Sequence, residues 1–144
     1  MPSPRTEAER LTWLGAAMYL LMQSDLHRPL RLADAEALFV VPATLGQARL
    51  YAVGPRPVGL VTWAWFTEGA EAAHLEGERA VAPEEWQGGD RLWFPDFVAP
   101  FGHLASIVRA SRDVIPRGAV GRGARRAPDG SVRRIQVFRP LAGA

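Results

Sequence analysis

Residues 24–28 read SDLHR, and they contain His27, whose side chain is suited to moving a proton near neutral pH. A run of apolar residues precedes the segment and Pro29 follows it. Ser24 can satisfy the last carbonyls of a helix or can touch a substrate. His27 itself can be a general base or a residue that caps a helix C-terminus. The segment alone leaves both readings open.

The residues before this segment predict a helix from about residue 7 to residue 23. Thr6 and Glu9 have the spacing of a capping box, in which each side chain bonds the other residue's backbone. Pro29 stops a helix because proline lacks a donor and restricts the residue before it. His27 is therefore expected just past the helix C-terminus. The apolar residues recur at helical spacing: Leu11, Leu14, Met18, Leu21 and Met22.

The rest of the chain predicts several strands and one more clear helix. We expect a helical or irregular stretch to about residue 38, where LFVVP is a brief strand or a helix end. His74 is expected on a strand, and residues 82–90 in a loop or short helical turn. Pro95 inside a strand indicates an edge, a bulge or a splayed end. The expected strands are 49–53, 58–66, 91–99, 118–125 and 132–138, with a helix from about 102 and a turn at 127–130.

This order of elements predicts a mixed α/β fold of the α+β kind, with a mostly antiparallel sheet flanked by helices. The chain has 144 residues, which is the size of one domain, and we expect residues 1–144 to form it. No repeat and no linker-like segment divides the sequence.

Composition excludes several kinds of site. The chain has no cysteine, so thiolate zinc sites, disulfides and cysteine nucleophiles are excluded. It has no H-E-x-x-H motif, serine-hydrolase elbow or Walker A sequence, and we expect no metal. No apolar run approaches the length of a membrane span, and the N-terminus is unlike a secretory signal. Every basic residue is arginine, which a GC-rich genome or an enzyme that modifies lysines would explain.

Positive charge is concentrated at the C-terminus. Residues 1–108 carry a net charge of −5 and residues 109–144 carry +7, which gives +2 for the chain. An arginine-rich region of this kind suggests an acidic partner, such as a protein, a phosphorylated group or nucleic acid. The segment RGAVGRGAR can hold a phosphate on its backbone amides or can be a basic strand edge.

Two motifs together carry more information than any of these features. The first is MYLLMQSDLHRPL, and the second is PEEWQGGDRLWFPDFVAPFG at residues 83–102. Together with the strand RPVGLVTWA, they resemble the RTX toxin-activating lysine acyltransferases over about residues 8–103. The sequence departs from the family pattern at Pro95, at Phe97 and in a short arginine-rich tail.

The resemblance implies a fold like that of the GNAT acetyltransferases and a role in the bacterial cytoplasm. It implies transfer of a fatty acyl group from acyl-acyl carrier protein, with no further cofactor, to a lysine of an acceptor such as an RTX protoxin. It also implies a homodimer. His27 and Asp96 would be the catalytic pair, and Ser24, Arg28 and Trp93 would contact substrate, although a tryptophan such as Trp93 is also a common core residue.

These residue types suit acyl transfer to an amine. A lysine of ordinary pKa is neutral only about 0.04% of the time at pH 7, so a base must remove its proton. A carboxylate such as Asp96 would orient His27 and stabilise its charged form. His27 could instead carry the acyl group itself as an acyl-imidazole. Two other functions stay open: transfer to a small amine, and a non-catalytic module whose arginines hold an acidic partner or nucleic acid. Nucleic acid is less favoured, because Phe138 is the one aromatic residue that the C-terminal region offers for stacking.

Overall fold

The computed structural model describes residues 6–77, 81–127, 129 and 131–141. Groups of helical segments alternate with groups of strands along these residues. The helices are α1 (Glu7–Met22), α2 (Leu32–Ala35), the π-helical η1 (Glu36–Val40), α3 (Val41–Thr44), α4 (Glu68–Glu76), the 3₁₀ turn η2 (Pro83–Glu85), α5 (Leu104–Ser111) and the 3₁₀ turn η3 (Arg112–Val114). The strands are β1 (Ala48–Val53), β2 (Arg56–Thr62), β3 (Ala64–Phe66), β4 (Arg91–Trp93), β5 (Phe97–Val98), β6 (Gly121–Arg126) and β7 (Val132–Phe138).

The strands form two sheets, and the chain passes from one sheet to the other more than once. The first sheet has the order β1-β2-β5 and the second has the order β3-β4-β6-β7. All the strand pairs are antiparallel except β4 with β6. The expected mixed α/β fold with a mostly antiparallel sheet is therefore confirmed, with the strands divided between two sheets. The likeness to the GNAT fold stays a prediction.

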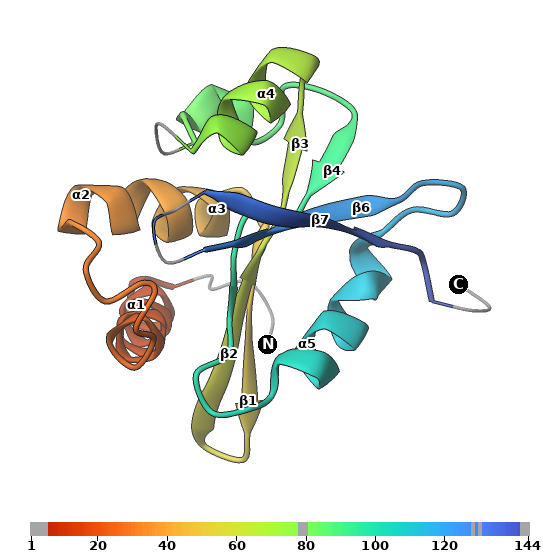
Figure 1. Cartoon of the computed structure of the whole chain (residues 1–144). Helices are drawn as coiled ribbons and strands as arrows, with labels where there is room; N and C mark the ends of the chain where they lie inside the picture. The colour runs from red at the N-terminus through yellow and green to blue at the C-terminus, as the bar shows by residue number, and fades with distance from the viewer. Residues whose placement is uncertain (1–5, 78–80, 128, 130, 142–144) are drawn as a thin grey trace.

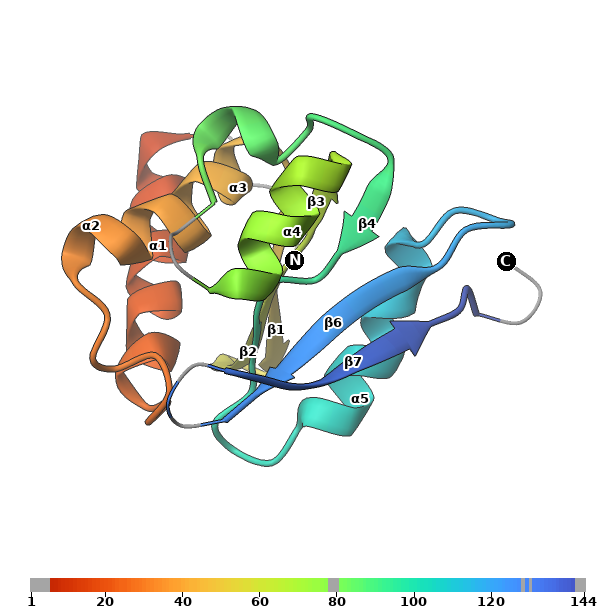
Figure 2. The same cartoon turned by 45° about the horizontal axis from the view of Figure 1, so that its top comes forward.

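Helices cover both sheets (Figures 1 and 2). Helix α1 packs on β2, α4 lies against β3, and α5 lies against β2 and β5. The β6–β7 ribbon crosses in front of the junction between the two sheets in Figure 1. No helix among the described residues is both long enough and apolar enough to cross a membrane.

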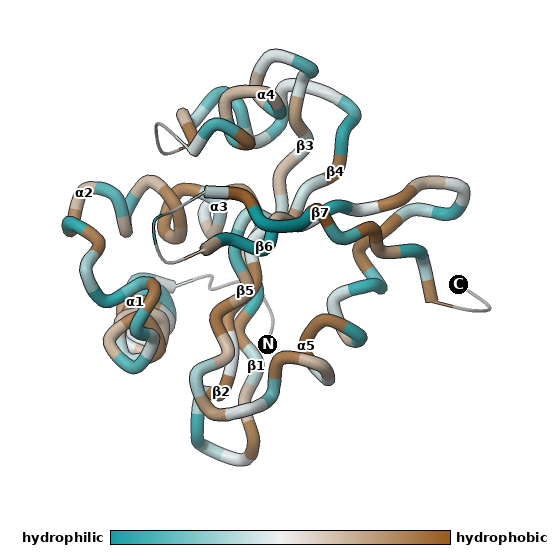
Figure 3. The backbone as a smooth tube through the Cα atoms, viewed as in Figure 1, coloured by the Kyte–Doolittle hydropathy of each residue, from teal (hydrophilic) through white to brown (hydrophobic). Residues whose placement is uncertain are grey.

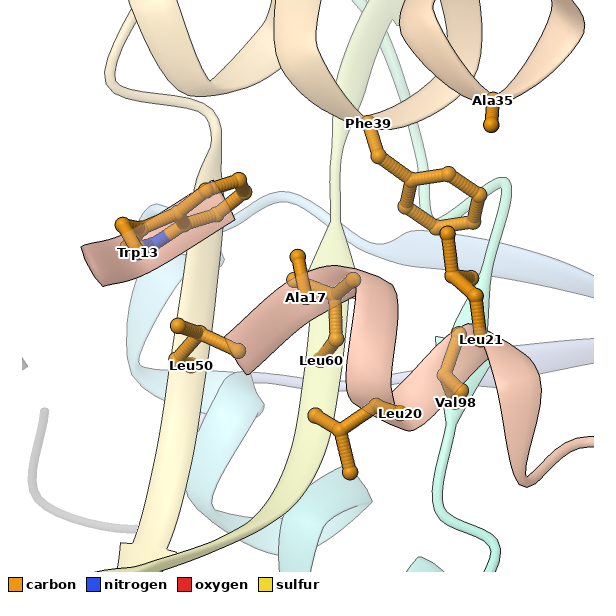
Figure 4. Close-up of a cluster of buried hydrophobic side chains, with 9 residues drawn as sticks. All are labelled: Trp13, Ala17, Leu20, Leu21, Ala35, Phe39, Leu50, Leu60 and Val98. Carbon is orange, nitrogen blue, oxygen red and sulfur yellow. The ribbon is translucent and has the colours of Figure 1, made fainter. Parts of the chain in front are cut away.

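The start of α1 shows the Thr6 side-chain bond of the predicted capping box. The Thr6 hydroxyl accepts a hydrogen bond from the backbone N–H of Glu9 at 3.0 Å, and the helix ends at Met22. Its buried face packs against strands of the first sheet and against η1 (Figure 4). This cluster fixes α1 and the chain after it against the sheet: Trp13, Ala17, Leu20, Leu21, Ala35, Phe39, Leu50, Leu60 and Val98.

Two expectations about local structure were wrong. His74 lies in α4, not on a strand, because Thr67 caps that helix with a hydrogen bond from the Ala70 N–H and Gly77 ends it with φ of 69°. The strand expected at 58–66 is broken at Trp63, where the chain passes from the first sheet into the second.

The ambiguous segment LFVVP is helical. Pro42 has no N–H to donate to the preceding turn, and the helix there widens into the π-helical turn η1 before α3 begins. The expected turn at 127–130 lies partly outside the described residues.

Candidate active site

The segment that carries His27 folds into consecutive turns after α1. The Ser24 carbonyl accepts hydrogen bonds from the N–H groups of His27 at 3.1 Å and Arg28 at 2.8 Å. The His27 carbonyl accepts another from Leu30 at 3.0 Å. These bonds fix the backbone on both sides of His27, and its imidazole ring meets the Phe39 ring edge to face, with 5.8 Å between centroids.

Asp96 lies at the point where a strand changes sheets. β4 pairs with β3 and β6 and ends at Trp93, whereas β5 pairs with β2 and begins at Phe97. Pro95 lies in this break, as its place in the sequence led us to expect. The backbone carbonyl of Asp96 accepts a hydrogen bond from Thr62 at 3.2 Å, which ties the carboxylate-bearing residue to β2.

The two segments bring three side chains into one hydrogen-bonded chain. His27 Nε2 lies 2.8 Å from Asp96 Oδ1, and His27 Nδ1 lies 2.6 Å from Ser24 Oγ. His27 is 6% exposed and the Asp96 side chain is 17% exposed. Because a carboxylate only accepts hydrogen bonds, Nε2 carries the proton of the ring and donates a hydrogen bond to Asp96. In the neutral ring, Nδ1 is then the basic nitrogen, and it accepts from the Ser24 hydroxyl.

This arrangement can accept a proton and stabilise the resulting cation. The Asp96 carboxylate fixes the tautomer of His27 and favours the imidazolium form. The Ser24 hydroxyl occupies the position from which a proton would reach Nδ1. His27 lines a small cavity of about 140 Å³, whose other lining residues are apolar except for Arg28. The site therefore combines a base with an apolar approach.

Of the two other residues expected to contact substrate, Arg28 lies beside the cavity and Trp93 lies in the core. Arg28 lines the cavity beside His27, is exposed, and donates to the Met22 carbonyl at the end of α1 at 3.3 Å. Trp93 is 1% exposed, and its indole N–H donates to Glu71 at 2.7 Å. Because Trp93 is enclosed in the core of the second sheet, we propose no contact between Trp93 and substrate.

His74 is a half-buried residue that the sequence placed among ordinary surface or strand residues. Its ring lies between those of Phe66 at 5.4 Å and Trp93 at 5.5 Å, and its Nε2 has no hydrogen-bond partner. Burial, together with the nearby positive charge of Arg126, lowers the pKa of His74 to about 4, although Asp96 acts in the opposite direction. The N-cap and C-cap signals at Thr67 and Gly77 could have placed this residue on a helix.

No metal centre is present among the described residues, since they contain no cluster of three or more histidine, aspartate or glutamate side chains suited to an ion.

Comparison with known proteins decides the family. The model of the RTX toxin acyltransferase family matches residues 6–139. The chain belongs to this family. The family match extends from the start of α1 to the end of β7, so it includes Ser24, His27 and Asp96.

Individual members of the family are identical to the chain at about one third of the aligned residues. It is 34% identical over 67% of its length to a leukotoxin-activating lysine-acyltransferase of a Pasteurella haemolytica-like species. It is 33% identical over 87% of its length to the RTX-I toxin-activating lysine-acyltransferase of Actinobacillus pleuropneumoniae. It is 30% identical over 98% of its length to a protein-lysine palmitoyltransferase of Bordetella bronchiseptica. The chain spans 58%, 72% and 77% of these three relatives, respectively.

Proposed function

We propose that the chain is a protein lysine acyltransferase that transfers a fatty acyl group from acyl-acyl carrier protein to a lysine of a protein acceptor. The observation that carries this proposal is the hydrogen-bonded chain from Ser24 through His27 to Asp96, whose central residue, His27, lines a mostly apolar cavity. Family membership supports the reaction class, because the relatives are named lysine acyltransferases or a lysine palmitoyltransferase.

In the proposed step, the lysine Nζ attacks the thioester carbonyl carbon. The C–N bond forms as the C–S bond breaks, and the carrier's thiol leaves. His27 takes the proton of the attacking amine at Nδ1, either directly after Ser24 turns aside or through the Ser24 hydroxyl, and returns it to the leaving thiolate. Asp96 stabilises His27 while the ring is charged.

The acidic carrier protein has a candidate docking surface. A cleft of about 770 Å³ lies between α5 and the β6–β7 ribbon, and four of its lining residues are arginines: Arg109, Arg112, Arg125 and Arg139. Figure 3 shows the hydrophilic character of much of this ribbon. Positive charge around an open cleft would attract an acidic partner and orient its approach. A carrier-protein donor would place the enzyme in the bacterial cytoplasm, and we propose a homodimer on the family resemblance alone.

Transfer can be tested with the purified chain, palmitoyl-acyl carrier protein and an RTX protoxin as acceptor. Mass spectrometry should find the acyl mass on acceptor lysines, and acceptor with those lysines changed to arginine should stay unmodified. The chain contains no lysine, so side-chain amide products on the enzyme will not obscure the result.

The non-catalytic alternative predicts different results. Salt-sensitive binding of nucleic acid or of an acidic protein, without amide formation on any offered acceptor, would favour a binding module. Acylation of a small amine but not of protoxin would keep the chemistry and change the acceptor.

A further inference from the structure

The cavity at His27 adjoins a larger, mostly apolar groove beside α1. The groove, of about 460 Å³, runs between α1 and the helical segment 32–40. Four residues line both spaces, so the two spaces are adjacent: Met18, Leu21, Leu32 and Ala35. We call this surface the α1–α2 groove. It adjoins the cavity lined by His27, and its own lining includes Leu14 and Val40.

The lining of the α1–α2 groove suits a ligand that makes no hydrogen bonds. Glu36 is its one charged lining residue, and it is exposed. None of the buried polar atoms that lack a partner among the described residues lies on the groove. Leu32 is 74% exposed and Leu14 is 37% exposed, so apolar surface stays in water along the groove. Covering such surface with hydrocarbon is favourable, and no polar group would be left without a partner.

A second, mostly apolar cavity, whose lining also includes Arg10 and Thr44, adjoins the groove further along α1. Leu14 and Val40 also line a space of about 490 Å³ that reaches Leu11 and Leu45. A narrow occupant could therefore extend from His27 along several turns of α1. A linear chain of methylene groups has this shape and chemistry.

We propose that the α1–α2 groove binds the hydrocarbon tail of the acyl donor, with the thioester carbonyl held at His27. This inference rests on the proposed function, since it assumes that a fatty acyl group reaches His27. It adds that the lining of this groove sets the acyl length that binds. Each further methylene buried should tighten binding about fourfold until the groove is full.

Binding of straight-chain fatty acids from octanoate to palmitate tests the proposal without any transfer reaction. Calorimetry below the critical micelle concentration should show affinity rising with length in the wild-type protein. Leu32→Asp places a charge where the cavity and the groove join, and it should weaken palmitate binding at least tenfold. Leu26→Asp is the matched control, because Leu26 is 62% exposed and lines neither the cavity nor the groove. It should leave binding within twofold of wild type.

Met18→Trp gives a second variant that fills the shared section without adding charge, and it should shorten the longest chain that binds. Affinity that is independent of chain length, or unchanged in both Leu32→Asp and Met18→Trp, would overturn the proposal. The proposal would also be overturned if these variants changed only the oligomeric state, measured by light scattering. That result would mean that a second copy of the chain covers the groove. Fatty-acid binding with the predicted pattern but no acyl transfer would instead reject the proposed function and leave the groove assignment standing.

Discussion

At the scale of single residues, the account depends on how two distant side chains meet. His27 lies on a turn after α1 and Asp96 lies in a strand break 69 residues later, yet their reactive atoms are 2.8 Å apart. Ser24 completes the arrangement from the turn itself at 2.6 Å. The position of Ser24 relative to His27 could be predicted from their spacing. The meeting with Asp96 could not, because nothing local relates the two segments, and only the family resemblance paired them.

Asp96→Asn tests the proposed role of the carboxylate. An amide of the same shape can present its NH₂ to Nε2, which would reverse the tautomer of His27 and remove stabilisation of the imidazolium. We expect acyl transfer to fall at least about 10²-fold, with little change in the thermal unfolding midpoint. The rate of amide formation under single-turnover conditions would measure this. A variant with the wild-type rate would show that the carboxylate has no part in catalysis.

Ser24→Ala tests whether the Ser24 hydroxyl passes a proton to His27 or carries the acyl group covalently. If Ser24 only occupies the place of the amine or passes its proton, the variant should keep at least about one tenth of the wild-type rate, because water or substrate can replace the hydroxyl. An acyl-serine intermediate predicts complete loss of transfer, together with a hydroxylamine-sensitive acyl group on the wild-type enzyme. Intact-protein mass spectrometry during turnover distinguishes these outcomes.

His74 should make the protein less stable in mild acid. Its pKa is lowered in the folded protein to about 4 from an ordinary 6.5, so the unfolded chain binds a proton that the native state does not. The cost is absent above about pH 6.5 and grows as the pH falls toward 4, to an order of about 3 kcal/mol. Urea unfolding at pH 7, 5.5 and 4.5 should show this loss in the wild type.

His74→Phe is the matched variant for this effect. Phenylalanine preserves a flat ring between Phe66 and Trp93 and leaves no polar atom unpaired there. The loss of stability between pH 6.5 and 4 should be smaller in this variant than in the wild type. Identical pH profiles would mean that the His74 ring takes up a proton as easily in the folded protein as in the unfolded chain.

At the scale of elements, the break between β4 and β5 brings the carboxylate to the first sheet. Pro95 signalled an interruption in the sequence, and the structure places a change of sheet there. The helix starts at Thr6 and Thr67 carry equally local signals. By contrast, Phe39 and Val40 of η1 have strand-forming side chains, but packing of Phe39 against α1 outweighs that local preference.

Glu71 joins α4 to β4 and should contribute to stability. It accepts from the buried indole of Trp93 and from Arg91, both at 2.7 Å. Glu71→Ala leaves the indole N–H without its partner, and we expect a loss of about 1–3 kcal/mol in the free energy of unfolding. Glu68→Ala is the control, since Glu68 is 86% exposed and lies 3.9 Å from Arg91. It should change stability by less than about 0.5 kcal/mol in urea unfolding. Equal effects would contradict the assignment.

At the scale of the whole molecule, charge and apolar surface lie in different places. The basic C-terminal region forms the cleft between α5 and the β6–β7 ribbon, whereas the α1–α2 groove lies beside α1. Composition predicted the charge asymmetry, because counting arginines requires no fold. It could not predict that arginines of α5, β6 and the residue after β7 would surround one cleft, because that depends on how the ribbon lies against α5.

The arginine-lined cleft should control binding of the carrier protein. Arg109→Glu with Arg125→Glu reverses two exposed charges of the cleft, and we expect acyl carrier protein to bind at least tenfold more weakly at low salt. Arg133→Glu is the control, because Arg133 is exposed on β7 but does not line the cleft. Fluorescence anisotropy with labelled carrier protein over a salt series measures both. If the control weakens binding as much as the cleft variant, the attraction is general and the cleft is not the docking surface.

The most direct test of the central claim is the rate of amide formation by His27→Ala, with palmitoyl-acyl carrier protein and a protoxin acceptor. If the imidazole deprotonates the attacking lysine, the rate should fall at least about 10²-fold while circular dichroism stays that of the wild type. Adding Asp96→Asn to His27→Ala should reduce the rate little further, because the two side chains act as one unit. A correctly folded His27→Ala protein that transfers the acyl group at the wild-type rate would contradict the account.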